Sequence, residues 1–237
     1  MKLLITSLSV KWTAAIIIGG MVIVVLVGYI ACSGKPDIPP QKAIDQALAN
    51  TAGQHSYEYE IRMKTVIDGK DELVSEVKGS RQEQNRIHII GRIFESEVDF
   101  YQIGSTTYTK DQLTGEWIKI TDTQLNQQDI FMQELNPLAG FSYKELNEAV
   151  FAGAETIDGK RLWVYTAKPV IDNEYMALLW QGFQYKFWVE PRGFLVYNAQ
   201  INAVGKNNVT NKLNLEVKFR KYNGDIEVKE PDAGNPQ

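Results

Sequence analysis

The sequence predicts a mainly β domain of the α+β class, built on a curved antiparallel sheet of about ten or eleven strands. Apolar and polar residues alternate along several segments, most regularly from Leu213 to Arg220. Turn signals separate these segments, as at Asp68-Gly69 and Asn223-Gly224. Because such dipeptides reverse a chain within two residues, consecutive strands are expected to pair as hairpins in meander order. The alternation indicates a sheet with one apolar and one polar face.

A short helix is expected before the strands. Pro40 suits a first helical turn, apolar residues follow at helical spacing from Ala43 to Leu48, and Gly53 suits the end. The first strand then follows, because Tyr57, Tyr59 and their i+2 neighbours alternate with charged residues. The same period predicts strands around residues 183–189 and 197–203, with Tyr197 on the apolar face.

Two regions lack the period of a strand. Residues 123–151 are expected to form two or three short helical pieces, split at Asn136-Pro137. Residues 173–181 are predicted to form a helix that is apolar on nearly every side, which is typical of a buried helix. We therefore expect that this helix packs against the apolar face of the sheet.

The composition excludes several classes of function. A net charge of -4 gives no general attraction to nucleic acid. The single cysteine and two histidines supply no zinc-finger set, and no motif for a cofactor or a catalytic nucleophile occurs. His55 and His88 are interpreted as surface residues. We expect no enzyme, no metal, no cofactor and no nucleic-acid partner.

The N-terminal residues 1–34 predict a signal or membrane anchor. Lys2 and Lys11 precede an uncharged segment from Trp12 to Gly34, which is long enough for a helix that crosses a bilayer. This arrangement favours an N-terminus inside the cell and the rest of the chain outside. Two alternatives stay open for how this segment attaches the protein to the membrane. The sequence around Cys32 resembles a bacterial lipobox, which makes Cys32 a lipid anchor, whereas an uncleaved single-span helix gives the same topology.

Three further segments complete the predicted organisation. Residues 35–39 form a proline-rich linker, residues 40–230 the folded domain and residues 231–237 a flexible tail. We expect the domain to be held at the extracytoplasmic side of a bacterial cell membrane.

A sheet with one apolar face needs a cover, because exposed apolar surface is unfavourable by ~25 cal/mol per Å². Short helices pack loosely on a curved sheet, so an apolar groove is expected on the concave side. The alternative is that the same side chains fill an ordinary core. The candidate lining residues are Tyr57, Tyr59, Phe131, Met132, Leu135, Trp163, Tyr165, Met176, Leu179 and Trp180.

The order of these segments resembles the LolA/LppX group of lipoprotein-carrier-like domains. The likeness rests on the strand and turn sequences 101–119, 157–165 and 185–194, and it covers about residues 40–230. It implies an open antiparallel half-barrel with helices on its concave side. Members of the group bind the acyl chains of lipids or lipoproteins there, or sense envelope lipoproteins and signal to a protein partner.

The sequence thus leaves two main hypotheses. The first is a membrane-anchored extracytoplasmic protein that binds an acyl chain, lipid or lipoprotein in the concave face. The second is an envelope sensor or interaction domain with a filled core, which binds a protein partner and carries no lipid. An enzyme would need a cluster of titratable groups in one pocket.

Overall fold

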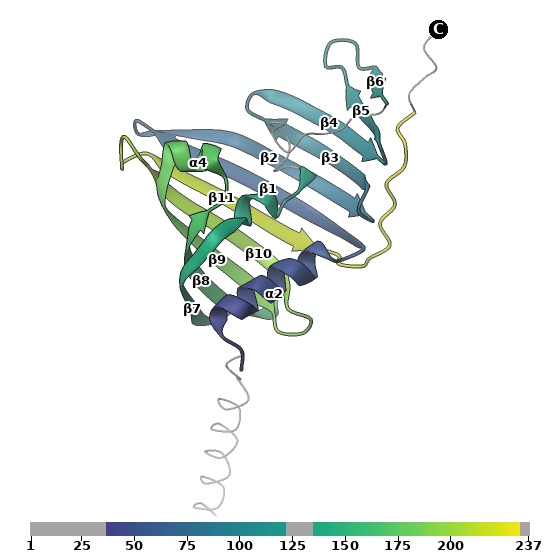
Figure 1. Ribbon diagram of the computed structural model, residues 1–237. Coiled ribbons are helices and arrows are strands. Elements are labelled where there is room, and N and C mark those ends of the chain that lie inside the picture. The colour runs from purple at the N-terminus through teal and green to yellow at the C-terminus, as the bar shows by residue number, and fades with distance from the viewer. Residues whose placement is uncertain (1–36, 122–134, 233–237) are drawn as a thin grey trace, which may run out of the picture. The chain divides into compact units, whose positions relative to one another are not determined.

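The computed structural model describes residues 37–121 and 135–232. The chain divides into two units, Met1–Asp37 and Ile38–Gln237, and the sheet belongs to the second unit. Its strands form one 11-stranded antiparallel sheet with the order β6-β5-β4-β3-β2-β1-β11-β10-β9-β8-β7 (Figure 1). Strands β6 and β7 lie at opposite edges, so the sheet is open. The predicted class, antiparallel arrangement and number of strands are confirmed.

The strands form two meanders. The first contains β1 (Ser56–Ile67), β2 (Lys70–Gln82), β3 (Arg86–Ile93), β4 (Ser96–Ile103), β5 (Thr106–Lys110) and β6 (Trp117–Ile120). The second contains β7 (Tyr143–Ile157), β8 (Lys160–Ile171), β9 (Trp180–Glu190), β10 (Leu195–Gly205) and β11 (Lys212–Arg220). The first strand pairs with the last in the middle of the sheet. The prediction of a meander throughout is therefore wrong at one point, since β6 does not pair with β7.

Helix α2 (Pro40–Ala52) is the predicted short helix. Its apolar stripe, with Ala43, Ile44 and Ala47, is buried, and the helix packs against β10 and β7. The hydroxyl of buried Thr51 accepts a hydrogen bond of 2.9 Å from the backbone N–H of Val196. In Figure 1, α2 lies across the concave side of the sheet. The predicted bounds of this helix are confirmed.

The Asp-Gly turns have the predicted geometry. Asp68 and Gly69 have φ angles of 50° and 78°, and Asp158 and Gly159 have 51° and 75°. Both residues of a type I′ turn need positive φ, which asparagine, aspartate and glycine adopt most readily. The repeated sequence Ile-Asp-Gly-Lys thus forms the same turn at both positions.

The helical predictions after residue 121 are partly wrong. Residues 122–134 lie outside the described part of the chain, and the 3-10 helix η1 (Ala139–Phe141) is followed directly by β7. The segment from Tyr143 to Phe151 is therefore strand, not helix. The polar and apolar residues along β7 alternate only in part, because its ladder to β8 contains three irregularities.

Helix α4 (Glu174–Leu179) is shorter than expected and has no buried residue. The predicted burial of an all-round apolar helix is wrong. Tyr175, Leu178 and Leu179 are exposed, because α4 lies at the end of the sheet where β8 turns into β9, and not against the apolar face. The prediction for Tyr197 is also wrong. A β-bulge between Val196 and Asn198 directs it to the outer face, where it packs with Trp188.

One aromatic ring fills the space beside a glycine on the neighbouring strand. The ring of Tyr59 lies across Gly79 on β2, so that a Cβ atom built at Gly79 would lie only 2.0 Å from its Cζ. Tyr59 is 1% exposed and contacts Tyr57 edge-on, with ring centroids 6.0 Å apart. The ring therefore has no free space into which it could move. A glycine at position 79 is required by packing.

We predict that Gly79→Ala lowers the free energy of unfolding by about 1 to 3 kcal/mol, because the new methyl group overpacks the enclosed ring of Tyr59. Urea unfolding followed by circular dichroism measures this change. Gly53→Ala is the matched control. It has φ of −80° and its Cβ would meet only ordinary contacts, so its stability should change by less than about 1 kcal/mol. Equal effects of both substitutions would contradict this account of Gly79.

Candidate functional site

The concave face of the sheet collects the apolar residues of the central strands. Direct partners across an antiparallel ladder share a face, and β1 and β11 pair Tyr59 with Phe219, Ile61 with Val217 and Met63 with Leu215. All of these except Met63 are buried. The concave face is thus the core of the domain where α2 and the segment 135–142 lie over it.

The segment 135–142 is attached to β9 by two aromatic contacts and by the hydroxyl of Tyr185. The ring of Phe141 lies 5.4 Å from that of Tyr185 and 5.3 Å from that of Phe187, centroid to centroid. The hydroxyl of Tyr185 is placed to donate to the carbonyl oxygens of Gly140 and Ser142, at 3.0 and 3.3 Å. Burial raises the pKa of Tyr185 well above its ordinary value. This tyrosine therefore stays neutral and fixes the segment on the sheet.

Half of the predicted lining residues lie in this enclosed core. Their side chains are 9% exposed or less, and they are Tyr57, Tyr59, Leu135, Tyr165 and Trp180. The hydroxyl of Tyr57 accepts a hydrogen bond of 2.9 Å from Arg81 Nη1. Burial raises the pKa of Tyr57 in spite of this cation. These residues pack against protein atoms on all sides.

The other predicted lining residues are more scattered. Trp163 is half-buried near α2, with its ring 5.4 Å from that of Phe194. Met176 is half-buried at the other end of the face, and Leu179 is 56% exposed beside it. Phe131 and Met132 lie outside the described residues. The structure therefore does not gather the predicted set around one groove.

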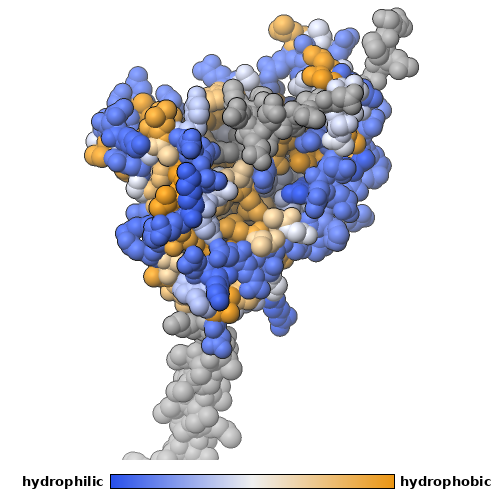
Figure 2. All heavy atoms as spheres, in the orientation of Figure 1, coloured by the Kyte–Doolittle hydropathy of each residue, from blue (hydrophilic) through white to orange (hydrophobic). Residues whose placement is uncertain are grey.

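Six half-buried apolar side chains flank the enclosed core, and we call them the open part of the concave face. They pack against the core on one side and are accessible on the other, and they are Met63, Ile67, Val98, Phe100, Ile171 and Met176. Through the ladders of β2 and β3, Val98 shares a row with Ile61, and Phe100 shares one with Tyr59. Both therefore point to the concave side. Figure 2 shows apolar residues at the floor of a recess in this face, between hydrophilic residues.

Sequence patterns alone did not single out Val98 and Phe100. A signal for them was present, because both alternate with the polar residues Glu97, Asp99 and Tyr101 along β4. The strand is short and contains two acidic residues, so its alternation of apolar and polar residues is hard to recognise in the sequence. Neither Val98 nor Phe100 carries a polar side-chain atom, so the surface that they present is purely apolar.

The outer face carries charged residues and a small pocket. The pocket has a volume of about 140 Å³ and lies over β1, β2 and β11, lined by Glu60, Ile61, Arg62, Glu76, Val77, Lys78, Glu216 and Lys218. Its side chains pair across strands, as with Arg62 and Glu76 at 3.2 Å and Lys78 and Glu60 at 3.8 Å. A pocket of compensated charges is unsuited to an apolar ligand.

Each histidine faces a single carboxylate. His88 Nε2 lies 2.9 Å from Asp99 Oδ1 and its ring stacks on Tyr101 at 3.9 Å. The side chain of His55 is 80% exposed and lies 3.4 Å from Glu83. Among residues 37–121 and 135–232, no group of three or more His, Cys, Asp or Glu is placed to hold a metal ion. Each histidine thus has one carboxylate partner, exposed at His55 and part-buried at His88.

Within those same ranges, no helix combines the length and apolar character that crossing a membrane requires. The predicted anchor, residues 1–34 with Cys32, lies outside the described residues.

Tyr165 offers a test of how tightly the core is filled. It is 0% exposed, its hydroxyl has no hydrogen-bond partner among the described residues, and burial raises its pKa to about 12. A buried hydroxyl without a partner is destabilising. We predict that Tyr165→Phe raises the free energy of unfolding at neutral pH by about 1 kcal/mol.

The same substitution should alter the alkaline pH dependence. The raised pKa means that the folded state holds the proton after the unfolded state has lost it, so stability is present below pH 10 and lost between about pH 10 and 12. Tyr165→Phe should reduce this loss in urea unfolding at each pH. Tyr185→Phe is the control and should destabilise, since that hydroxyl is bonded. A stability decrease in Tyr165→Phe would show that its hydroxyl has a partner.

Comparison with known proteins identifies the fold. No protein-family model matches the sequence, and no curated protein sequence matches it significantly. The lipoprotein LppX of Mycobacterium tuberculosis has a TM-score of 0.55 at 16% identity, over 82% of this chain and 100% of LppX. LprF of Mycobacterium bovis has a TM-score of 0.55 at 13% identity, over 85% of this chain and 100% of LprF. Such identities establish the fold alone. The chain has the LolA/LppX-like half-barrel fold that its sequence predicted.

Proposed function

We propose that this protein binds the hydrocarbon chain of a lipid or lipoprotein at the open part of its concave face. One observation carries the proposal. Met63, Ile67, Val98, Phe100, Ile171 and Met176 are apolar, partly accessible and continuous with the core. An acyl chain laid against them would remove their surface from water, which is favourable by ~25 cal/mol per Å².

The chemistry of these side chains suits an acyl chain better than a rigid or polar ligand. Two of the six are methionines, whose unbranched thioethers adapt to an irregular partner. None of the six carries a charge or a hydrogen-bonding group that would select a polar headgroup. The proposed selectivity is therefore for hydrocarbon, with the headgroup left in solvent.

We propose further that the domain works at the extracytoplasmic side of a bacterial membrane. The support comes from the sequence, in which Lys2 and Lys11 precede a long uncharged segment that contains Cys32. A lipid on Cys32 and an uncleaved helix would both hold the domain close to the bilayer. The likeness in fold to a protein described as a lipoprotein agrees with an envelope location.

A protein-binding role without lipid is the second candidate, and one observation favours it. Tyr57, Tyr59 and Tyr165, which the sequence placed in a groove, are enclosed by protein atoms. The concave face near α2 is therefore filled. If the protein's own side chains also enclose the open part in solution, the domain would bind a protein partner through its outer surface and carry no lipid. Neither role uses a catalytic group.

The binding site is tested by Phe100→Ser. Removing this ring takes away a large part of the accessible apolar surface, so the affinity for the fluorescent fatty acid cis-parinaric acid should fall about tenfold. Fluorescence titration of the purified full chain measures the change. Ile90→Ser is the matched control, because Ile90 is 49% exposed on the outer face of the neighbouring strand.

Circular dichroism should show that both variants keep the fold. Equal affinities of the two variants would contradict the proposed site. Extraction of the purified wild-type protein that yields no stoichiometric lipid, together with no binding of the fatty acid, would favour the protein-binding role.

The anchor is tested by Cys32→Ala. If Cys32 is lipidated, this substitution should abolish incorporation of a labelled fatty acid into the protein in growing bacterial cells, because the thiol is the site of acylation. Ser33→Ala is the control and should leave labelling unchanged. Labelling that persists in Cys32→Ala, or that is absent in the wild type, would leave the uncleaved helix as the anchor.

A further inference from the structure

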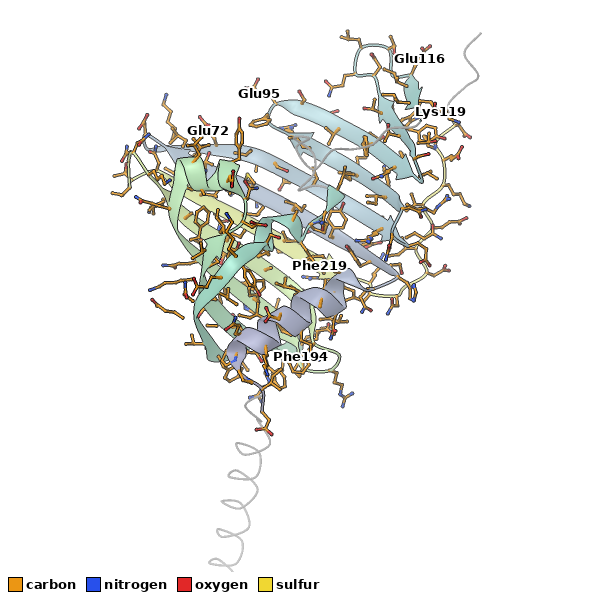
Figure 3. The ribbon with its side chains drawn as sticks, in the orientation of Figure 1. Glu72, Glu95, Glu116, Lys119, Phe194 and Phe219 are labelled. Atoms are coloured by element: carbon orange, nitrogen blue, oxygen red, sulfur yellow. The ribbon has the colours of Figure 1, made fainter. Side chains whose placement is uncertain are left out.

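The two ends of the sheet differ in the residues that they expose. At one end lie the connections 68–69, 94–95, 111–116, 172–179 and 206–211, which we call the hairpin rim. At the other end lie the connections 83–85, 104–105, 158–159 and 191–194. Figure 3 shows Glu95 and Glu116 on the rim, Glu72 on β2 next to it, and Phe194 at the opposite end, beside α2.

Hydrogen bonds join three of the five connections of the rim. The backbone N–H of Asp68 donates to Asn211 Oδ1 at 2.9 Å, which joins the first hairpin to the β10–β11 turn. The N–H of Lys206 donates to the carbonyl oxygen of Leu179 at 3.0 Å, which joins that turn to α4. Elements far apart in the sequence are therefore held side by side at this end.

Large apolar side chains are exposed at the rim and not at the opposite end. Six rim residues are between 56% and 97% exposed, and they are Phe94, Leu113, Tyr175, Leu178, Leu179 and Val209. In the four connections at the other end, the one large apolar residue is Phe194, which is half-buried against Trp163. Exposed apolar residues are common singly, but their concentration at one end is not expected from folding alone.

Phe94 combines an exposed ring with a strained backbone, whereas Phe194 at the opposite end has a similar φ of 50° but is half-buried against Trp163. Phe94 has φ of 52°, in the left-handed region that disfavours a bulky side chain, and it is 60% exposed. Glycine or asparagine would form this turn with less strain. The sequence therefore keeps an aromatic ring at the tip of the β3–β4 hairpin at the expense of stability.

We propose that the hairpin rim docks on the surface of a lipid bilayer of neutral net charge and that it is where an acyl chain passes between the bilayer and the open part of the concave face. The second half of this inference rests on the proposed function. Both Met176, which lies within the rim on α4, and Ile67, which lies next to the rim at the end of β1, belong to the open part. The apolar surface thus continues from the rim inward.

The distribution of the exposed residues favours a bilayer over a protein. A protein interface has a contiguous, fully buried centre, whereas these side chains stand on separate hairpin tips with polar residues between them. Separate tips can insert one by one into the boundary between headgroups and acyl chains. Tyr175 suits this boundary, since its ring is apolar and its hydroxyl is polar.

The charged residues of the rim indicate which lipid headgroups it can approach. Its five connections contain the basic residue Lys206 and six acidic residues, which are Asp68, Glu95, Asp111, Glu116, Asp172 and Glu174. Anionic headgroups would be repelled by this excess, and the repulsion would weaken with salt. A zwitterionic lipid such as phosphatidylcholine avoids it.

The test is flotation of the full chain with vesicles, with its N-terminal segment kept soluble by an amphipathic polymer. The rim variant combines Phe94→Asn and Leu178→Ser, and the control combines Ile90→Ser and Val150→Ser, at outer-face positions that are 49% and 50% exposed. With phosphatidylcholine vesicles, the rim variant should bind at least about tenfold more weakly than the wild type, and the control should not. All three proteins share the same N-terminus, so differences report on the rim.

When phosphatidylglycerol is added to the vesicles, the difference in vesicle binding between the wild type and the rim variant should become smaller at low salt and be restored at high salt. Equal flotation of the wild type and the rim variant would overturn the proposal and leave the rim as a surface for a protein partner. The proposal would also be overturned if the wild type and the rim variant differed more in binding to anionic vesicles than in binding to phosphatidylcholine vesicles.

The two proposals fail separately. Titration with cis-parinaric acid measures the concave face, and the rim variant should keep the wild-type affinity at equilibrium. Loss of fatty-acid binding with intact rim-dependent flotation would refute the binding site alone.

Discussion

The structure depends on the pairing of its first strand with its last. Strands β1 and β11 meet at the centre of the sheet, with nine residue pairs in continuous register from Glu58 and Arg220 to Val66 and Lys212. On the outer face, Glu60 opposes Lys218 and Arg62 opposes Glu216. On the concave face, aromatic and aliphatic residues oppose one another. A shift by one residue would place charges in the core and apolar residues in water, so both faces specify the same register.

This central pairing determines how the concave face is covered. Because β1 and β11 occupy the middle, β6 and β7 fall at opposite edges, and the chain between them has to travel from one edge to the other. Strands lie about 4.8 Å apart, so eleven of them span roughly 50 Å along the sheet. Residues 135–142 follow the concave side, where Phe141 packs on Tyr185 and Phe187. Residues 135–142 of this connection are thus also part of the core.

The local features of the fold could be predicted from the sequence, because they have local causes. Period-two alternation identifies β11, Asp-Gly dipeptides identify the turns, and the proline at position 40 identifies the start of α2. The order of the two meanders could not be predicted, since alternation records which face a residue occupies and not which strand lies beside it. Helix α4 was misjudged for a related reason. An all-round apolar helix is buried when it lies on a sheet, but α4 lies at the end of one.

The candidate site shows the same division. Sequence patterns select residues that face inward, and Tyr57, Tyr59 and Tyr165 do so. Whether an inward residue is enclosed or accessible depends on which segment lies over it, and that is fixed by the central pairing of β1 with β11. The face is a filled core under α2 and residues 135–142, and its side chains are partly accessible at Val98 and Phe100, which the sequence analysis did not select.

The two ends of the domain also differ in how they hold large apolar side chains, because Phe94 and Leu178 are exposed at the hairpin rim, whereas Phe194 is half-buried next to α2. Folded proteins have a small net stability, so an exposed Leu178 or a left-handed Phe94 must be compensated elsewhere. The compensation lies at the end next to α2, where Tyr57, Phe219 and Tyr222 form a cluster of aromatic contacts with centroid distances of 5.5 to 6.1 Å. The half-barrel is therefore polarised. The end next to α2 holds the aromatic cluster, and the hairpin rim exposes large apolar side chains.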